Sequence, residues 1–201
     1  MSDDRTPGRR ARDASGDATV LVADDDGDVA DLYATWLQGR YEVRVAYGGT
    51  EALKALDGGV DVFLLDRQMP GLAGDEVLER VRERGLDVRV VMVTAVDPDF
   101  DILDMPFDDY LVKPVTREDV TDAVATMLAR ASYDETLREY FALAEKKATL
   151  EAEKPARELE RSERYAELTE RVRRLETRAD VALSRVSDDY EAAFREAGAG
   201  D

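Results

Sequence analysis

The chain has 201 residues, enough to bury the core of one or two domains. Its 46 Asp and Glu residues outnumber its 28 Lys and Arg residues, so the formal net charge is −18 and general binding to nucleic acid or anionic membranes is not expected. The absence of Cys and His excludes disulfides, thiolate zinc sites, cysteine nucleophiles and Ser-His-Asp triads. Carboxylate, hydroxyl and lysine chemistry with a hard metal ion remains.

Residues 1–17 are polar and show no apolar periodicity, which predicts a disordered tail. Arg9 and Arg10 are not followed by an apolar segment, so they do not indicate a twin-arginine export signal. No stretch approaches the roughly 18 apolar residues that a membrane span needs. We therefore expect a cytoplasmic protein that does not act in a membrane.

From Thr19 onward, short β-branched runs alternate with amphipathic stretches. Strands are predicted at Thr19–Ala23, Tyr41–Ala46, Val60–Leu65, Val88–Val93 and Tyr110–Val112, and helices at 28–39, 49–57, 74–84, 98–104 and from Thr116. The sequence TRED at Thr116 is a variant of the capping box, with Asp119 three residues after the N-cap. Strands that alternate with helices predict an α/β fold with a doubly wound parallel sheet.

Beyond about Ser132 the strand pattern stops, and the chain is expected to be helical to about Tyr190. Leu137, Tyr140, Phe141, Ala144 and Ala148 are predicted to form the apolar face of a first helix, and Pro155 interrupts it. A second helix carries apolar residues at alternating spacings of four and three. Two arrangements fit this all-α extension, namely a helical hairpin folded at Pro155 and a coiled coil between chains.

Chemically useful side chains follow the predicted strands. Asp24, Asp25 and Asp26 follow the first strand, Asp66 the third, Thr94 ends the fourth, and Lys113 with Pro114 follows the fifth. Ligands of open parallel sheets bind outside the carboxyl ends of the strands. Several carboxylates at one edge favour a hard cation such as Mg²⁺, with Asp66 as a candidate nucleophile for phosphoryl transfer and Lys113 and Thr94 as contacts for phosphoryl oxygens.

The runs VLVADDD, VFLLDRQMPG, VMVTA and DYLVKP resemble the receiver domain of two-component response regulators. The resemblance covers residues 18–131 and implies a flavodoxin-like sheet of strand order 2-1-3-4-5. It implies that Asp66 is the phosphoacceptor and that a sensor histidine kinase is the partner, so the chain is not an enzyme with a separate substrate.

The same resemblance implies roles for the neighbouring residues. Asp24, Asp25, Asp66 and the backbone carbonyl of Gln68 would bind Mg²⁺ or Mn²⁺. Thr94 and Lys113 would contact the phosphoryl group, and Thr94 with Tyr110 would form the switch. Pro114 would follow a cis peptide bond from Lys113.

One departure from the family pattern stands out. The segment between Thr94 and Lys113 is short and contains Pro98 and Pro106, so the fourth helix is expected to be stunted. This places the usual output and dimerisation surface in doubt.

Each site residue also has a plainer interpretation. The three aspartates after the first strand could form a solvated acidic loop, Asp66 and Thr94 could cap strands, and Tyr110 could be a core aromatic. A magnesium-dependent phosphatase is disfavoured because Gln68, rather than an acid, stands two residues after Asp66.

The C-terminal run SYDETLREYFALAEKKATLEAEK resembles the HalX domain of haloarchaeal regulators. We expect this domain at 132–190, followed by a flexible C-terminus at 191–201, and an output through a protein partner or a homodimer. The alternative is a transcription regulator whose tail binds DNA. Arg157, Arg164, Arg171, Arg178 and Arg185 recur every seven residues, but arginines at the edge of paired helices explain them better than DNA contacts do.

The basic residues comprise five Lys and 23 Arg, and an acidic, arginine-rich composition resembles that of proteins from extremely halophilic archaea. Molar salt shortens the Debye length to about 3 Å and screens self-repulsion. We predict salt-dependent folding; an ordinary acidic protein is the alternative.

Overall fold

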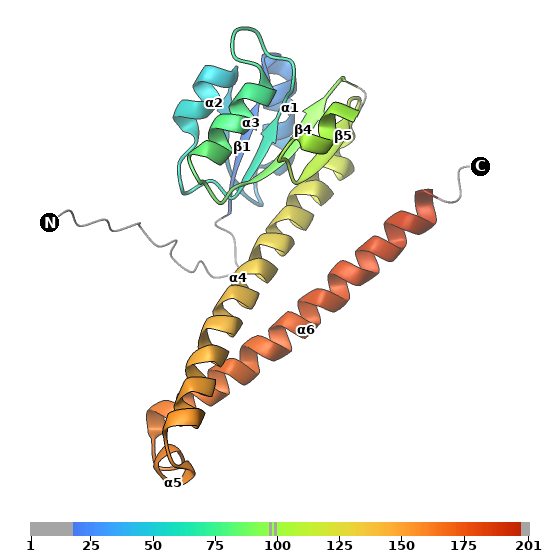
Figure 1. Cartoon of the computed structure of the whole chain (residues 1–201). Coiled ribbons are helices and arrows are strands. Elements are labelled where there is room, and N and C mark those ends of the chain that lie inside the picture. Colours follow the sequence, from blue (N-terminus) through green and yellow to red (C-terminus); the bar gives the residue numbers. More distant parts are fainter. Residues whose placement is uncertain (1–17, 97, 99, 198–201) are drawn as a thin grey trace, which may run out of the picture. The chain divides into compact units, whose positions relative to one another are not determined.

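A computed structural model describes residues 18–96, 98 and 100–197, without the side chains of 101 and 182–197. The predicted N-terminal tail at 1–17 and residues 198–201 lie outside this range. The five strands are β1 (Thr19–Ala23), β2 (Glu42–Ala46), β3 (Val62–Leu65), β4 (Arg89–Thr94) and β5 (Asp109–Val112). They form one parallel sheet of order β2-β1-β3-β4-β5, which confirms the predicted fold and strand order (Figure 1).

The sheet carries a hydrophobic core on each face, as expected for strands covered on both sides. One face packs against α2 (Gly49–Ala55) and α3 (Gly74–Glu83), through strand residues such as Phe63 and Met92. The other packs against α1 (Gly27–Leu37) and the first turns of α4 (Arg117–Glu153), through residues such as Val22 and Leu64. Successive strand residues point to opposite faces, so every second side chain joins each core.

The fourth helix of the predicted series is reduced to a short 3₁₀ segment, η1 (Phe100–Asp104). The prediction of a stunted helix is therefore confirmed. The physical reason is the pair of prolines, Pro98 and Pro106, which leave too few residues between them for several α-helical turns.

The chain divides into two compact units, Met1–Leu128 and Ala129–Asp201, with the boundary inside α4. The second unit contains the rest of α4, the short α5 (Ala156–Leu159) and α6 (Glu163–Ala197). Pro155 is the N-cap of α5, and the hydroxyl of Ser162 accepts a hydrogen bond from the backbone N–H of Tyr165 at the start of α6. Pro155 thus ends the first long helix, as expected, and starts the short α5, whereas the second long helix begins only after Ser162.

Side-chain contacts within the second unit join α4 and α6. The Tyr165 hydroxyl donates to Glu151 Oε1 at 2.6 Å, and Arg171 pairs with Glu139. Residues progressively earlier in α4 contact residues progressively later in α6, so the two helices run antiparallel. Of the two predicted arrangements, these contacts are those of a hairpin within one chain.

Two details of the hairpin differ from the sequence prediction. Phe141 is 64% exposed and does not lie on the inner face of the hairpin. The less exposed side of α4 is formed by residues spaced three or four apart, namely Thr136, Tyr140, Leu143, Lys147 and Leu150. Phe141 and Ala148 each follow one of these positions directly and therefore point away from that side. The helix α6 continues to Ala197, past the predicted end at Tyr190, because the final stretch EAAFREA is rich in helix-forming residues.

No helix in the described part of the chain is long and apolar enough to cross a membrane.

Candidate phosphoacceptor site

The carboxyl ends of β1 and β3 place two aspartates side by side. Ala23 and Leu65, the last residues of these strands, are register partners, and the backbone N–H of Asp66 donates to the carbonyl of Ala23 at 2.9 Å. The next residues are therefore Asp24 and Asp66, whose exposed fractions are only 2% and 5%. The pairing of the strands brings together two acids that lie far apart in the sequence.

Asp25, which is exposed, completes a group of three carboxylates. One oxygen from each of Asp24, Asp25 and Asp66 can lie within 4.8 Å of the others, a spacing at which a metal ion could bind to all three. Oxygen ligands of this kind suit a hard divalent cation such as Mg²⁺. These are the aspartates predicted as metal ligands from the sequence, whereas Asp26 has a different role.

Asp26 is the N-cap of α1. Its Oδ1 accepts hydrogen bonds from the backbone N–H groups of Asp28 at 3.0 Å and Val29 at 3.3 Å, and its own N–H donates to Asp24 Oδ1 at 3.1 Å. The capping carboxylate satisfies donors that the first helical turn leaves free. Asp26 thus fixes the start of α1 beside the acidic cluster and holds one oxygen of Asp24.

Lys113 bridges the two buried aspartates. Its Nζ lies 2.6 Å from Asp24 Oδ2 and 3.1 Å from Asp66 Oδ1. The lysine follows β5, its backbone N–H donates to the carbonyl of Thr94 at 2.8 Å, and the Lys113–Pro114 peptide bond is cis, as the family resemblance implies. One positive charge therefore contacts two of the three clustered carboxylates, and the remaining negative charge favours a cation.

Burial and neighbouring charges shift the pKa values of both Asp66 and Lys113, but with a different balance in each. Burial raises the pKa of Asp66 above its ordinary value; the nearby charge and hydrogen bond of Lys113 oppose this effect and Asp24 adds to it. Burial alone would lower the pKa of Lys113, but the hydrogen bonds and charges of Asp24 and Asp66 outweigh it, so that the pKa is raised. Lys113 therefore carries its positive charge at neutral pH.

The backbone after β3 holds the second oxygen of Asp66. The N–H of Gln68 donates to Asp66 Oδ2 at 3.0 Å. The proposed role of the Gln68 carbonyl in metal binding stays a prediction.

Two features of this loop were missed at the level of sequence. Arg67 Nε contacts both carboxylate oxygens of Asp75 at 3.1 Å, which ties the loop to α3. A Cβ on Gly74 would lie 2.2 Å from the carbonyl oxygen of Asp66, so only glycine allows α3 to start this close to the site. No sequence pattern predicts the Arg67–Asp75 ion pair. A glycine at the start of a predicted helix, such as Gly74, does indicate close packing of the backbone at that point.

Thr94 and Tyr110 are linked through one backbone residue, Val96. The fully buried Thr94 accepts a hydrogen bond on Oγ1 from the Val96 N–H at 3.3 Å, and the Tyr110 hydroxyl donates to the Val96 carbonyl at 2.7 Å. The Tyr110 ring also packs against Phe107, with ring centroids 5.5 Å apart. A movement of Val96 would therefore affect both predicted switch residues, a connection that sequence reasoning did not identify.

Comparison with known proteins decides the family. The model of the response regulator receiver domain matches residues 20–125, which is more than half of the chain. The chain belongs to the response regulator receiver family. In this chain, the receiver domain is followed by a HalX domain, whose model matches residues 129–194.

Curated relatives agree with this assignment. A Haloferax volcanii protein named "Putative transcriptional regulator" is 50% identical over 153 residues, which cover 76% of this chain and 26% of that protein. The response regulator SaeR of Staphylococcus epidermidis is 30% identical over 117 residues, covering 56% of this chain and 51% of SaeR. The chain thus spans between a quarter and about half of the length of these relatives.

Solved structures resemble the receiver part. A CheY-like receiver domain protein from Methanospirillum hungatei superposes with a TM-score of 0.54 at 25% identity, covering 58% of this chain and 98% of that chain. The receiver domain of Francisella response regulator 1452 gives a TM-score of 0.51 at 29% identity, covering 56% and 98%. The likeness is therefore to nearly complete receiver domains.

Proposed function

We propose that this response regulator accepts a phosphoryl group on Asp66 from a sensor histidine kinase and passes the change of state to its helical C-terminal unit. The observation that carries the proposal is the contact of one lysine, Lys113, with both Asp24 and Asp66 beside a third carboxylate, that of Asp25. The membership in the receiver family supports the same reaction. On this proposal the chain takes part in its own phosphotransfer and dephosphorylation and is not an enzyme with a separate substrate.

Asp24, Asp25, Asp66 and the carbonyl of Gln68 would hold the Mg²⁺ or Mn²⁺ ion. When bound, such an ion neutralises negative charge on the phosphoryl oxygens and the carboxylates. A carboxylate oxygen of Asp66 attacks phosphorus as the bond from phosphorus to the donor breaks, which forms an acyl phosphate. The N–H of Gln68 holds the other oxygen, and this bond orients the nucleophile.

Lys113 and Thr94 would stabilise the transferred group. The Lys113 ammonium, shared between Asp24 and Asp66, can donate to a phosphoryl oxygen once the Asp66 carboxylate has formed the acyl phosphate and lost its own charge. The Thr94 hydroxyl can donate a second bond. The sequence has no His, so a phosphohistidine donor has to lie outside these 201 residues.

The link through Val96 offers a route for the signal. If the Thr94 hydroxyl turns toward the phosphoryl group, it gives up its bond from the Val96 N–H, and the Val96 carbonyl that holds the Tyr110 hydroxyl is free to move. We infer that Tyr110 and β5 respond to phosphorylation through the backbone of Val96. The added charge of about −1.5 to −2 supplies the bias between the two states.

Two kinds of output are consistent with the C-terminal unit. The name of the Haloferax volcanii relative suggests transcriptional control, which the tail could exert by binding DNA or by contacting another protein. Arg171 is engaged with Glu139 across the hairpin, which is the behaviour of an arginine at the edge of paired helices. We therefore favour output through protein contacts, and a DNA-binding measurement with the full chain at several salt concentrations separates the two.

Phosphorylation is tested with acetyl phosphate and Mg²⁺, with the wild type compared to Asp66→Ala. We expect stoichiometric labelling of the wild type and none of the variant. Asp122→Ala is the matched control, because Asp122 is an exposed aspartate on α4 that is not part of the acidic cluster. Label retained in Asp66→Ala would contradict the assignment of the phosphoacceptor.

Transmission to the C-terminal unit is tested separately with a beryllofluoride mimic of the phosphoryl group. We expect a change in the protease sensitivity of residues 129–194 or in the mass of the protein in solution. Identical behaviour with and without the mimic, in a sample that binds it, would contradict the proposed output while leaving the phosphoacceptor assignment intact.

A further inference from the structure

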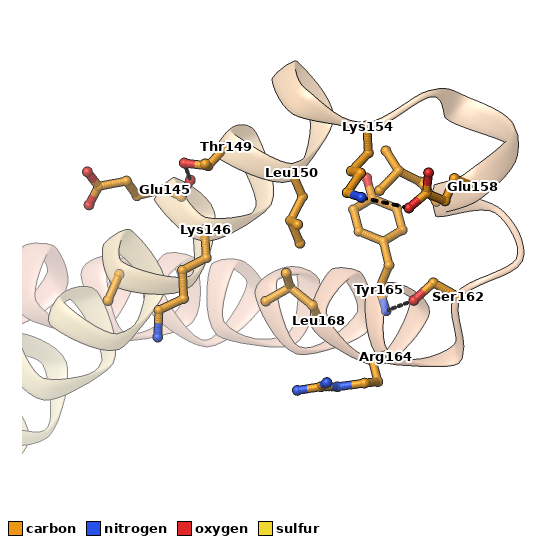
Figure 2. A pocket seen from close by; sticks show the side chains of 12 residues that line it. Glu145, Lys146, Thr149, Leu150, Lys154, Glu158, Ser162, Arg164, Tyr165 and Leu168 are labelled. Atoms are coloured by element: carbon orange, nitrogen blue, oxygen red, sulfur yellow. Dashed lines mark hydrogen bonds and ion pairs between the residues drawn. The ribbon is translucent and has the colours of Figure 1, made fainter.

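A groove opens at the closed end of the hairpin, where α4, α5 and α6 meet (Figure 2). Its volume is about 890 Å³, and its apolar floor includes Leu150, Leu159 and Leu168. Figure 2 shows Leu150 and Leu168 pointing toward each other from the two long helices. None of the lining residues is buried, so the groove is an open surface feature that suits a segment of another macromolecule better than an enclosed small molecule.

The rim of the groove is positively charged in an otherwise acidic chain. Its charged lining residues are Lys146, Lys154 and Arg164 against Glu145 and Glu158, a net charge of +1 in a chain of net charge −18. Lys154 is held by Glu158 at 2.9 Å, but Lys146 and Arg164 make no ion pair within the described part of the chain. In Figure 2 the charged ends of Lys146 and Arg164 point away from the acidic Glu145. The rim therefore offers two cations to an acidic ligand.

The receiver unit presents a segment with the matching properties. On η1, the side chains of Phe100 and Leu103 are 84% and 77% exposed, the highest values among the large apolar residues whose burial is described. Residues 96–109 contain six Asp and no Lys or Arg, and one of these acids, Asp104, is itself exposed. Two protruding apolar side chains in an acidic stretch complement an apolar groove with a cationic rim.

We propose that the groove of one copy binds η1 of a second copy, with Phe100 and Leu103 on the apolar floor and Asp104 facing Lys146 and Arg164. Each copy carries both surfaces, so two reciprocal contacts can close a twofold dimer. Burial of the two apolar side chains supplies the attraction, and the charges select the orientation. The contact uses neither Asp66 nor the metal ligands, so it does not depend on the proposed phosphorylation.

The first test is the mass of the full chain in solution, measured by sedimentation over a range of concentrations. We expect a concentration-dependent dimer whose dissociation constant rises at least about tenfold in Phe100→Ser. Phe141→Ser is the matched control, because Phe141 is also an exposed phenylalanine but does not line the groove. A wild type that stays monomeric, or equal weakening by both substitutions, would overturn the proposal.

The second test reverses the charges. Lys146→Glu is expected to weaken the dimer, and the addition of Asp104→Lys to the same chain is expected to restore part of the lost affinity, because the 104–146 pair again has opposite signs while Arg164 is unchanged. Both side chains are exposed, so neither substitution disturbs a buried contact. A double variant as weak as Lys146→Glu alone would contradict the placement of Asp104 at this rim.

The third test uses the absence of Cys from the chain. A Leu103→Cys protein is mixed with a Thr149→Cys protein under mild oxidation, and we expect a disulfide between the two different copies. The control mixture replaces Thr149→Cys by Phe141→Cys. Cross-linking no faster than in this control would show that a different partner, or none, occupies the groove.

Discussion

At the scale of single residues, Lys113 holds the candidate site together. It is the one cation that contacts both Asp24 and Asp66 among the described ion pairs, and the two carboxylates are nearly buried. A buried carboxylate that loses its counter-charge is costly. The same lysine also competes with any divalent cation for the negative charge of the cluster.

We therefore predict opposite effects of Lys113→Met on stability and on metal binding. Without divalent cations, the free energy of unfolding should fall by about 1–3 kcal/mol, because Asp24 and Asp66 lose their partner. The affinity for Mg²⁺ should rise, because a repelling charge is gone. Urea denaturation in a chelator and calorimetric titration with Mg²⁺ measure the two quantities.

Lys54→Met is the control for this prediction, since Lys54 is exposed on α2. It should change the free energy of unfolding by no more than about 0.5 kcal/mol and leave Mg²⁺ binding unchanged. Weaker Mg²⁺ binding by Lys113→Met would contradict the view that the lysine competes with the ion.

The parts of the candidate site that depend on strand ends could be predicted from the sequence, whereas those that depend on individual side-chain contacts could not. The neighbourhood of Asp24, Asp66 and Lys113 follows from strand ends that meet at one edge, so a periodicity argument is enough to find it. The pairing of Arg67 with Asp75 and the link from Thr94 to Tyr110 depend on side-chain directions and on the backbone of Val96. Such details leave no periodic trace in the sequence.

At the scale of elements, Asp108 anchors the segment that replaces the fourth helix. Its Oδ2 accepts from Arg82 at 2.8 Å and from the Val90 N–H at 2.9 Å, and its Oδ1 accepts from Arg89 at 2.8 Å. Arg82 also donates to the carbonyls of Pro106 and Val88. Asp108 and Arg82 thereby fasten the short η1 region to α3 and β4.

Asp108→Ala is expected to lower the free energy of unfolding by about 1–3 kcal/mol, because two guanidinium groups and a backbone N–H lose their acceptor. Denaturant-induced unfolding measures the loss. Asp104→Ala, at an exposed position on η1, should stay within about 0.5 kcal/mol of the wild type. Equal effects of the two substitutions would show that the Asp108 network does not hold this region.

The start of α4 gives a pH-dependent prediction. The Thr116 N–H and hydroxyl donate to Asp119 Oδ2 at 2.7 and 2.8 Å, and the Asp119 N–H donates to Thr116 Oγ1 at 3.2 Å, which confirms the predicted capping box. The hydrogen bonds from Thr116 lower the pKa of Asp119 in the folded chain. A lowered folded pKa means that the contribution is complete above the unfolded pKa and disappears as the pH falls through the folded pKa.

The stability difference between the wild type and Asp119→Asn should therefore be largest near neutral pH and vanish in acid. Denaturation at a series of pH values measures it. Asp122→Asn, at an exposed position farther along α4 and outside the capping box, is the control substitution. A difference that grows as the pH falls would contradict the sign of the linkage.

The elements themselves were largely predictable, with instructive exceptions. Five apolar runs placed the strands because buried parallel strands are nearly continuous in apolar residues. The side of α4 that Phe141 occupies was misjudged, because several nearly equivalent apolar stripes can be drawn along a helix rich in Ala and Leu. The interhelical pairing of Arg171 with Glu139 also could not be foreseen from spacings within one helix.

At the scale of the whole molecule, the net charge of −18 is the dominant physical property. Most of this charge has no part in the acidic cluster, so its main effect is repulsion between parts of the folded chain. We predict that the free energy of unfolding rises as KCl increases from about 0.1 M to about 3 M, where screening is nearly complete beyond contact distances.

Circular dichroism during urea unfolding at each salt concentration measures this effect. An uncharged osmolyte is the control, because it acts by exclusion from the surface without screening charges. Unchanged stability across the salt series would contradict the prediction of salt-dependent folding.

We propose Asp66, held by Lys113 and Gln68 beside the other carboxylates, as the residue that receives the phosphoryl group. The most direct measurement is to locate the phosphoryl group by peptide mass spectrometry after reaction with acetyl phosphate, with Mg²⁺ and with a chelator. We predict a single modified residue, Asp66, and modification only when Mg²⁺ is present. A phosphoryl group on another residue, or equal modification of Asp66 in the chelator, would contradict this role of Asp66.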